Sequence, residues 1–169
     1  GMPADQRLLF NQGLGLAIPL SLEGFLSDQM IAKNRPVHLR VTPDTDVREE
    51  LSRFTSSHPE AEVRVIPVTA ETDRFMLEGG LAPTPDGRQD FADGLLGRLV
   101  LEAQAHPDKH VVYVLENAHN LKPEVVVALN EILQDRKLYQ KGRDTRQSLP
   151  ANAHLLLVSR TDSDLAWSP

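Results

Sequence analysis

The stretch HVVYVLENAHNL, residues His110–Leu121, decides the fold of this 169-residue chain. It opens with an apolar, largely β-branched run, ends in the polar pair Glu116-Asn117, and is followed by a helical pattern. A short run that is apolar at successive positions is typical of a strand buried on both faces, as in a parallel sheet. The stretch therefore predicts an interior strand with polar side chains at its carboxyl end.

Similar runs recur along the chain, separated by apolar residues at helical spacing. We predict parallel strands at Val37–Val41, Val63–Val68, Val111–Leu115 and Leu155–Ser159. We predict helices at Ser21–Lys33, Asp46–Thr55, Phe91–Ala105 and Lys122–Gln134. Between them, Leu81–Arg88 is typical of a loop rich in Pro and Gly, and Lys137–Asn152 of a protruding hairpin or loop. This alternation predicts a single three-layer α/β domain over residues 1–169, with a mostly parallel sheet flanked by helices.

The composition narrows the function classes. There are 18 Lys and Arg residues against 24 Asp and Glu, which gives a net charge of −6 and argues against a nucleic-acid-binding or anionic-membrane-binding surface. The absence of cysteine excludes disulfides, thiol catalysis and Cys-ligated zinc. No apolar stretch approaches the roughly 20 residues of a membrane span. We expect a cytoplasmic domain that binds neither nucleic acid nor a membrane.

The run Glu116-Asn117-Ala118-His119 resembles the Asp-Glu-Ala-His form of the Walker B motif. Its continuation AHNLKPEVVVALNEILQDRKL resembles the next helix of AAA+ ATPases of the MoxR-like branch, and LPANAHLLLVSRTD resembles their sensor-1 strand. Upstream, RPVHLRVTPDTDVREEL resembles their first strand, phosphate loop and helix. The segments occur in the family's order over about residues 22–162. The resemblance implies a P-loop NTPase core with strand order 1-4-3-2, working with a protein partner or as a homo-oligomer.

The chain departs from that family in the phosphate loop. Such a loop needs glycines for close backbone approach, a Lys on the phosphates and a Ser or Thr on Mg²⁺. By the resemblance, Asp44 and Asp46 stand in place of the glycines, Val47 in place of the Lys, and Arg48 in place of the Ser or Thr. Each carboxylate about 4 Å from a phosphate charge would cost about 4 kcal/mol at an effective dielectric constant of about 20. These substitutions predict that no nucleotide or other cofactor is bound.

The Walker B and sensor-1 positions differ as well. By the resemblance, Glu116 stands where the family has Asp, Asn117 where it has the catalytic Glu, and Thr161 or Asp162 at the sensor-1 Asn. An amide cannot act as a general base. The family's helical lid subdomain has no counterpart in this sequence. We therefore expect no catalytic residue and no enzyme activity, but a non-catalytic AAA+-like domain that serves as a protein-interaction or regulatory module.

Two alternatives remain open. The first is an ATP-binding or ATPase domain of MoxR-like type, with ATP and Mg²⁺ as ligands, completed by a partner chain or a missing region. The second is a divalent-cation-binding domain, with the carboxylates of Asp44, Asp46 and Glu116 converging at the carboxyl ends of neighbouring strands. The simplest interpretation of the two aspartates is a turn followed by an N-cap of the next helix, with no metal bound.

Overall fold

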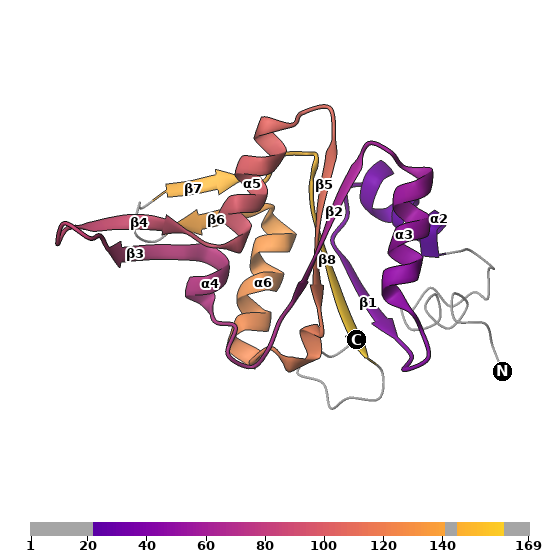
Figure 1. Ribbon diagram of the computed structural model, residues 1–169, viewed down its shortest axis with the longest axis horizontal. Helices are drawn as coiled ribbons and strands as arrows, with labels where there is room; N and C mark the ends of the chain where they lie inside the picture. The colour runs from indigo at the N-terminus through magenta and orange to yellow at the C-terminus, as the bar shows by residue number, and fades with distance from the viewer. Residues whose placement is uncertain (1–21, 141–144, 161–169) are drawn as a thin grey trace.

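The computed structural model describes residues 22–140 and 145–160 (Figure 1). A sheet of four parallel strands forms its centre, in the order β1-β8-β5-β2. These strands are β1 (Val37–Val41), β2 (Ala61–Pro67), β5 (His110–Glu116) and β8 (Ala153–Arg160). The order is the predicted 1-4-3-2, and each strand lies within two residues of its predicted bounds. The α/β class with a mostly parallel sheet is confirmed.

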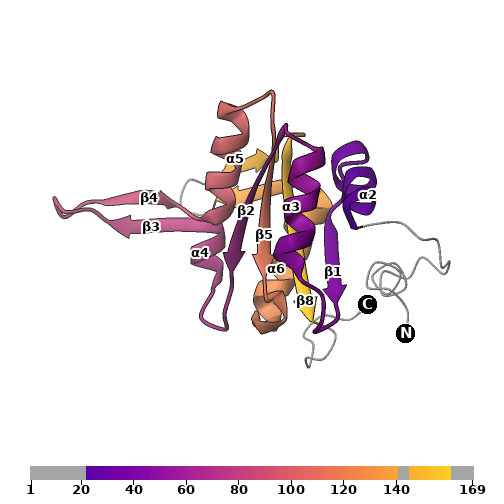
Figure 2. The ribbon, with the colours of Figure 1, turned by 45° about the vertical axis from the view of Figure 1, so that its right-hand side comes forward.

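Helices cover both faces of this sheet (Figure 2). On one side lie α2 (Leu22–Leu26), the π-helix η1 (Ser27–Ala32) and α3 (Val47–Ser57); on the other lie α5 (Leu95–Ala105) and α6 (Pro123–Asp135). Strand β5 shows why the central runs are continuously apolar. Its Val112 and Val114 belong to the core with α2 and α3, whereas Val111, Tyr113 and Leu115 belong to the core with α5 and α6.

Two helix starts follow directly from the residues at them. The Asp46 carboxylate accepts the backbone N–H of Glu49 at 3.1 Å, so it is the N-cap that the sequence indicated for α3. Pro123 opens α6, where its missing N–H leaves no hydrogen bond unmade. The segment predicted as one helix over Ser21–Lys33 instead changes from α2 to η1 at Ser27. No helix in the described ranges is long and apolar enough to cross a membrane.

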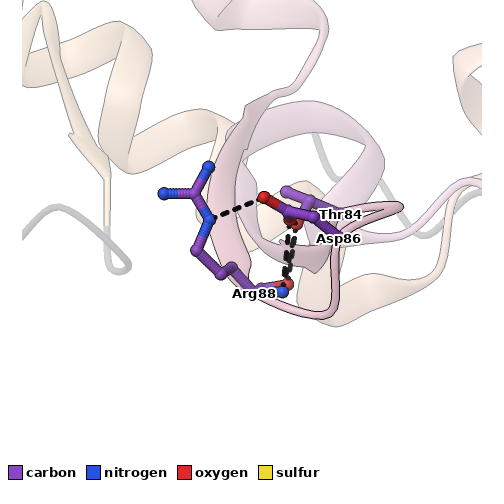
Figure 3. Close-up of polar contacts among 3 residues, drawn as sticks. All are labelled: Thr84, Asp86 and Arg88. Carbon is purple, nitrogen blue, oxygen red and sulfur yellow. Dashed lines mark hydrogen bonds and ion pairs between the residues drawn. The ribbon is translucent and has the colours of Figure 1, made fainter.

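One prediction was wrong in its local structure. After the short helix α4 (Arg74–Glu78), the strands β3 (Gly79–Pro83) and β4 (Gln89–Asp93) pair antiparallel where a loop and a helix start were predicted. Their connecting turn is closed by Asp86, which accepts hydrogen bonds from the Thr84 hydroxyl and from Arg88 Nε (Figure 3). Helix α5 begins only at Leu95 because the residues before it pair with β3.

A second antiparallel hairpin follows α6. Strands β6 (Lys137–Gln140) and β7 (Thr145–Ser148) pair within the segment predicted to form a hairpin, and both hairpins extend from the α5 and α6 side (Figure 1). Leu138 is fully buried in the core with α5 and α6, whereas Tyr139 is 43% exposed. The base of this hairpin is therefore part of the core.

Between β5 and α6 lies a short 3₁₀ helix, η2 (Ala118–Asn120).

Candidate functional site

A cavity of about 330 Å³ opens at the carboxyl ends of β1, β5 and β8, beside the first turn of α3. This edge is where open α/β sheets bind their ligands. The volume of the cavity is at the lower end of the roughly 300–1,000 Å³ found for ligand pockets. Its lining residues are Val41, Thr42, Pro43, Thr45, Asp46, Val47, Arg48, Glu116, Asn117, Val158 and Arg160.

The loop between β1 and α3 forms one wall of the cavity. The Thr42 and Thr45 hydroxyls lie 2.9 Å apart, and the Thr45 N–H donates to the Thr42 carbonyl at 3.0 Å, so the loop is a closed turn. The Thr42 hydroxyl also donates to the carboxylate of Asp44, which is not among the lining residues. Asp46 does line the cavity, with one carboxylate oxygen occupied by the α3 cap. Only one of the two aspartates therefore presents its side chain to the cavity.

An ion pair connects α3 to β5. Arg48 Nη2 lies 3.3 Å from Glu116 Oε1, and both residues line the cavity. The Arg48 side chain is 62% exposed and that of Glu116 is 24% exposed. A pair this exposed contributes about 0–1 kcal/mol to stability. The contact therefore adds little to the fold and leaves the guanidinium able to change partners.

The segment after β5 forms the opposite wall. Asn117 has the left-handed backbone conformation, with φ 64° and ψ 40°, which Asn adopts more readily than most residues. This turn ends the strand and starts η2. The backbone N–H of Arg160, at the end of β8, donates to His119 Nδ1 at 3.4 Å. The hydrogen bond links η2 to the neighbouring strand and places Arg160 at the cavity.

The predicted site residues mostly meet at this cavity. Asp46, Val47, Arg48, Glu116 and Asn117 all line it. Thr161 and Asp162 lie outside the described residues. Sequence reasoning missed three polar or charged lining residues: Thr42, Thr45 and Arg160. Each has a signal in the sequence, since the threonines alternate with the aspartates in TPDTD and Arg160 is the first charged residue after the apolar run of β8.

The carboxylates at the cavity do not form a cation site of the expected kind. Asp46 caps a helix, Glu116 pairs with Arg48, and Asp44 is turned toward Thr42. Within residues 22–140 and 145–160, no group of three or more His, Cys, Asp or Glu side chains is arranged to hold a metal ion. Two acidic residues and two arginines are among the lining residues, so the formal charges of the lining residues balance.

Two histidines of the central sheet, His38 in β1 and His154 in β8, have strongly shifted pKa values. Burial, with a smaller effect of the nearby Arg40, lowers the pKa of His38 to about 4. Burial, together with the nearby His110 and Arg136, lowers the pKa of His154 to about 3. His154 lies at the amino end of β8, opposite the cavity, and neither histidine lines it. These shifts bear on stability rather than on chemistry at the cavity.

Comparison with known proteins finds one family model and a set of similar solved structures, of which one is described here. A family model described as "AAA domain (dynein-related subfamily)" matches residues 45–164. The fold is similar to the crystal structure of "a putative ATPase" from Cytophaga hutchinsonii, with a TM-score of 0.56 and 14% sequence identity. The alignment covers 98% of this chain and 42% of that one, so the chain spans less than half the length of that protein. At this identity the likeness shows a shared fold. No curated protein matches the sequence.

These matches correct one expectation from the sequence. The chain was expected not to be an enzyme, because residues at the presumed catalytic positions differ from the AAA+ pattern. The family match instead points to an ATPase, and the similar solved structure supports the shared fold. The matched region includes most of the cavity lining, from Thr45 through Arg160.

Proposed function

We propose that this chain, which belongs to the dynein-related subfamily of AAA domains, is the nucleotide-binding core of a MoxR-like ATPase. Its site would be completed by a partner subunit or by a region outside this sequence. The observation that carries the proposal is the cavity where β1, β5 and β8 end beside the first turn of α3. A helix start at the carboxyl edge of a parallel sheet is the usual place for phosphate groups in such folds.

The residues at the cavity have the chemistry to bind a nucleoside triphosphate. Guanidinium groups bind phosphate oxygens with paired hydrogen bonds, and Arg48 and Arg160 bring two of them from different elements. The first N–H groups of α3 have no acceptor inside the helix, and Val47 and Arg48 of this first turn line the cavity. Glu116 has the carboxylate oxygens that Mg²⁺ prefers, and Mg²⁺, when bound, would neutralise phosphate charge. Arg48, Arg160 and Glu116 are thus the residues that we assign to phosphate and metal.

The repulsion expected between two aspartates and the phosphates of a nucleotide is smaller in this geometry. Asp46 lines the cavity, but Asp44 does not. Asp46 already accepts a helix N–H, which offsets part of its charge. The balance of two acidic and two basic side chains leaves no net repulsion for an incoming Mg²⁺ complex.

Two observations support a site that is shared with a neighbouring subunit: the small volume of the cavity and the family of the domain. The cavity is small for a ligand pocket, and this chain spans 42% of the related structure. AAA domains commonly form oligomers, so a neighbouring subunit can supply groups that this chain lacks. Homo-oligomers and complexes with another protein are both compatible with this requirement.

Calorimetric titration of the full chain with ATP and Mg²⁺ tests the binding step. We expect a dissociation constant below about 1 mM, and a rise in melting temperature that follows the ligand concentration. The Arg160→Ala variant should bind more weakly. Arg53→Ala is the matched control, because Arg53 lies on α3 but pairs with Glu49 and Glu50 and does not line the cavity. Absence of both heat and thermal stabilisation at millimolar ATP would refute the proposal.

Hydrolysis tests the shared site separately. If a second copy of the chain completes the site, phosphate release per molecule should rise with protein concentration, since the fraction of assembled chains rises. If another protein completes it, the rate should stay low at every concentration of this chain alone while ATP still binds. Full activity that does not depend on concentration would show that one chain is sufficient and would refute the shared site.

A further inference from the structure

We infer that Arg48 is the first cation of the cavity to bind an entering phosphate, and that Glu116 holds the Arg48 guanidinium there when no phosphate is bound. The inference rests on the proposed function and assigns its first recognition step to an exchange of partners. A phosphate group entering the cavity would take over the guanidinium and release the Glu116 carboxylate. The ligand chemistry is that of a polyphosphate, carried by a nucleotide or free.

The position of the ion pair supports this assignment. Arg48 is the second residue of α3, and Glu116 is the last residue of β5. Their contact at 3.3 Å joins two elements that both border the cavity. A ligand that reaches the first turn of α3 therefore meets this ion pair. The pair also keeps the guanidinium directed toward the sheet edge, although most of the Arg48 side chain is exposed.

The weakness of the contact makes the exchange favourable. It consists of a single nitrogen–oxygen contact at 3.3 Å, longer than the usual 2.7–2.9 Å of a charge-assisted hydrogen bond. A phosphate carries more negative charge than a carboxylate and accepts paired hydrogen bonds from a guanidinium. Arg48 would gain by the change of partner. Glu116, only 24% exposed, would be left as a carboxylate able to serve a cation that enters with the phosphates.

Neighbouring cations differ from Arg48 in their contacts. Arg53, five residues further along α3, pairs with Glu49 at 2.9 Å and with Glu50 at 3.2 Å. Those are partners on its own helix, away from the cavity lining. Arg160 reaches the cavity from β8, and its backbone is tied to His119. Arg48 is thus the arginine of α3 that faces the sheet edge, and its ion pair crosses to another element.

The test compares five proteins that each span residues 1–169: the natural chain, Arg48→Ala, Arg48→Lys, Glu116→Gln and the control Arg53→Ala. Each is titrated in a calorimeter with two probes, ATP with Mg²⁺ and inorganic tripolyphosphate without metal. Arg48→Ala should weaken binding of both probes by about tenfold or more. Glu116→Gln should tighten tripolyphosphate binding by about threefold, because it removes the competing charge. Thermal unfolding verifies that each variant folds, and Arg48→Lys, which keeps the charge, should recover part of the affinity.

The outcomes separate this inference from the proposed function. If the natural chain binds ATP and Arg48→Ala binds it equally well, the inference is overturned and the function stands. If only Glu116→Gln binds, the inference is supported, while the natural chain fails as a nucleotide-binding domain. If tripolyphosphate binds as tightly as ATP and depends on Arg48, the inference holds and the specificity for nucleotide fails. If none of the proteins binds either probe, both are overturned.

Discussion

His110 Nδ1 lies 2.9 Å from His154 Nε2, and the two rings are stacked with their centroids 5.1 Å apart. His110 begins β5, and His154 is the second residue of β8, so the pair joins two central strands at their amino ends. The hydrogen bond requires one nitrogen to donate and the other to accept. His154 is 2% exposed, and its burial, with His110 and Arg136 nearby, lowers its pKa to about 3.

This geometry predicts a loss of stability in mild acid. The pKa of His154 is about 3 in the folded chain and about 6.5 unfolded, so between these values the unfolded state binds the proton. The free energy of unfolding is therefore highest above about pH 6.5 and falls by up to about 1.4 kcal/mol per pH unit below it. His38, with a pKa lowered to about 4, adds a similar slope. Urea unfolding at several values between pH 7 and pH 4.5 measures this pH dependence of the free energy of unfolding.

The His154→Leu variant should have a shallower pH dependence of the free energy of unfolding, with the contribution of His38 remaining. His106→Gln serves as the control, because His106 is an exposed residue just after α5. The control should keep the natural slope. A His154→Leu protein with the same pH dependence as the natural chain would show that other groups cause the acid sensitivity.

The second prediction concerns Asn152, just before β8. Its Nδ2 donates to the carbonyls of Ala103 at 2.9 Å, His106 at 3.1 Å and Lys109 at 2.8 Å. These carbonyls belong to the end of α5 and the turn into β5. Asn152→Ala should lower the free energy of unfolding by about 1–3 kcal/mol, because these backbone carbonyls would lose their hydrogen-bond donor. Asn130→Ala, at an exposed position of α6, should change stability by about 0.5 kcal/mol or less. Equal effects in the two variants would refute the anchoring role.

The central sheet could be predicted because its signals are local. Val111–Leu115 is apolar at every position since β5 is covered on both faces, and Asp46 and Pro123 mark helix starts through their own chemistry. The β3–β4 hairpin carries no such signal. Its strands are short and half exposed, and the Pro and Gly residues of LAPTPDGR are equally typical of a loop. Its pairing is fixed by tertiary contacts that a single sequence does not display.

The candidate site was predictable in its position but only partly in its details. Parallel strands place their carboxyl ends together, so Asp46 and Glu116 could be expected at one edge. The direction of the Asp44 side chain could not, because it depends on the hydroxyl of Thr42 within the turn. Arg160 was missed because the predicted strand ended at Ser159, whereas β8 continues by one residue to Arg160.

The third prediction compares two glycines of the β3–β4 hairpin. Gly79 has φ +84° with ψ −175°, and Gly87 has φ +85°, so a substitution at either position adds the backbone strain of a positive φ. An added Cβ at Gly79 would lie 2.4 Å from the Ala92 carbonyl oxygen, whereas at Gly87 nothing lies within 4 Å. Gly87→Ala should lower the free energy of unfolding by about 1–2 kcal/mol. Gly79→Ala should lower it by about 1–3 kcal/mol more, because the added methyl group has no room. Denaturant unfolding of both variants decides, and equal losses would contradict the close approach at Gly79.

The last prediction concerns the β6–β7 hairpin, where adjacent residues have opposite environments. Leu138 is fully buried in the core with α5 and α6, whereas Tyr139 is 43% exposed beside α4. Leu138→Ala should therefore lower the free energy of unfolding by about 2–5 kcal/mol, because it leaves a cavity in the core. Tyr139→Ala should cost less than about 1 kcal/mol. Urea unfolding at neutral pH measures both. Similar losses at the two positions would mean that the hairpin does not sit on the core as described.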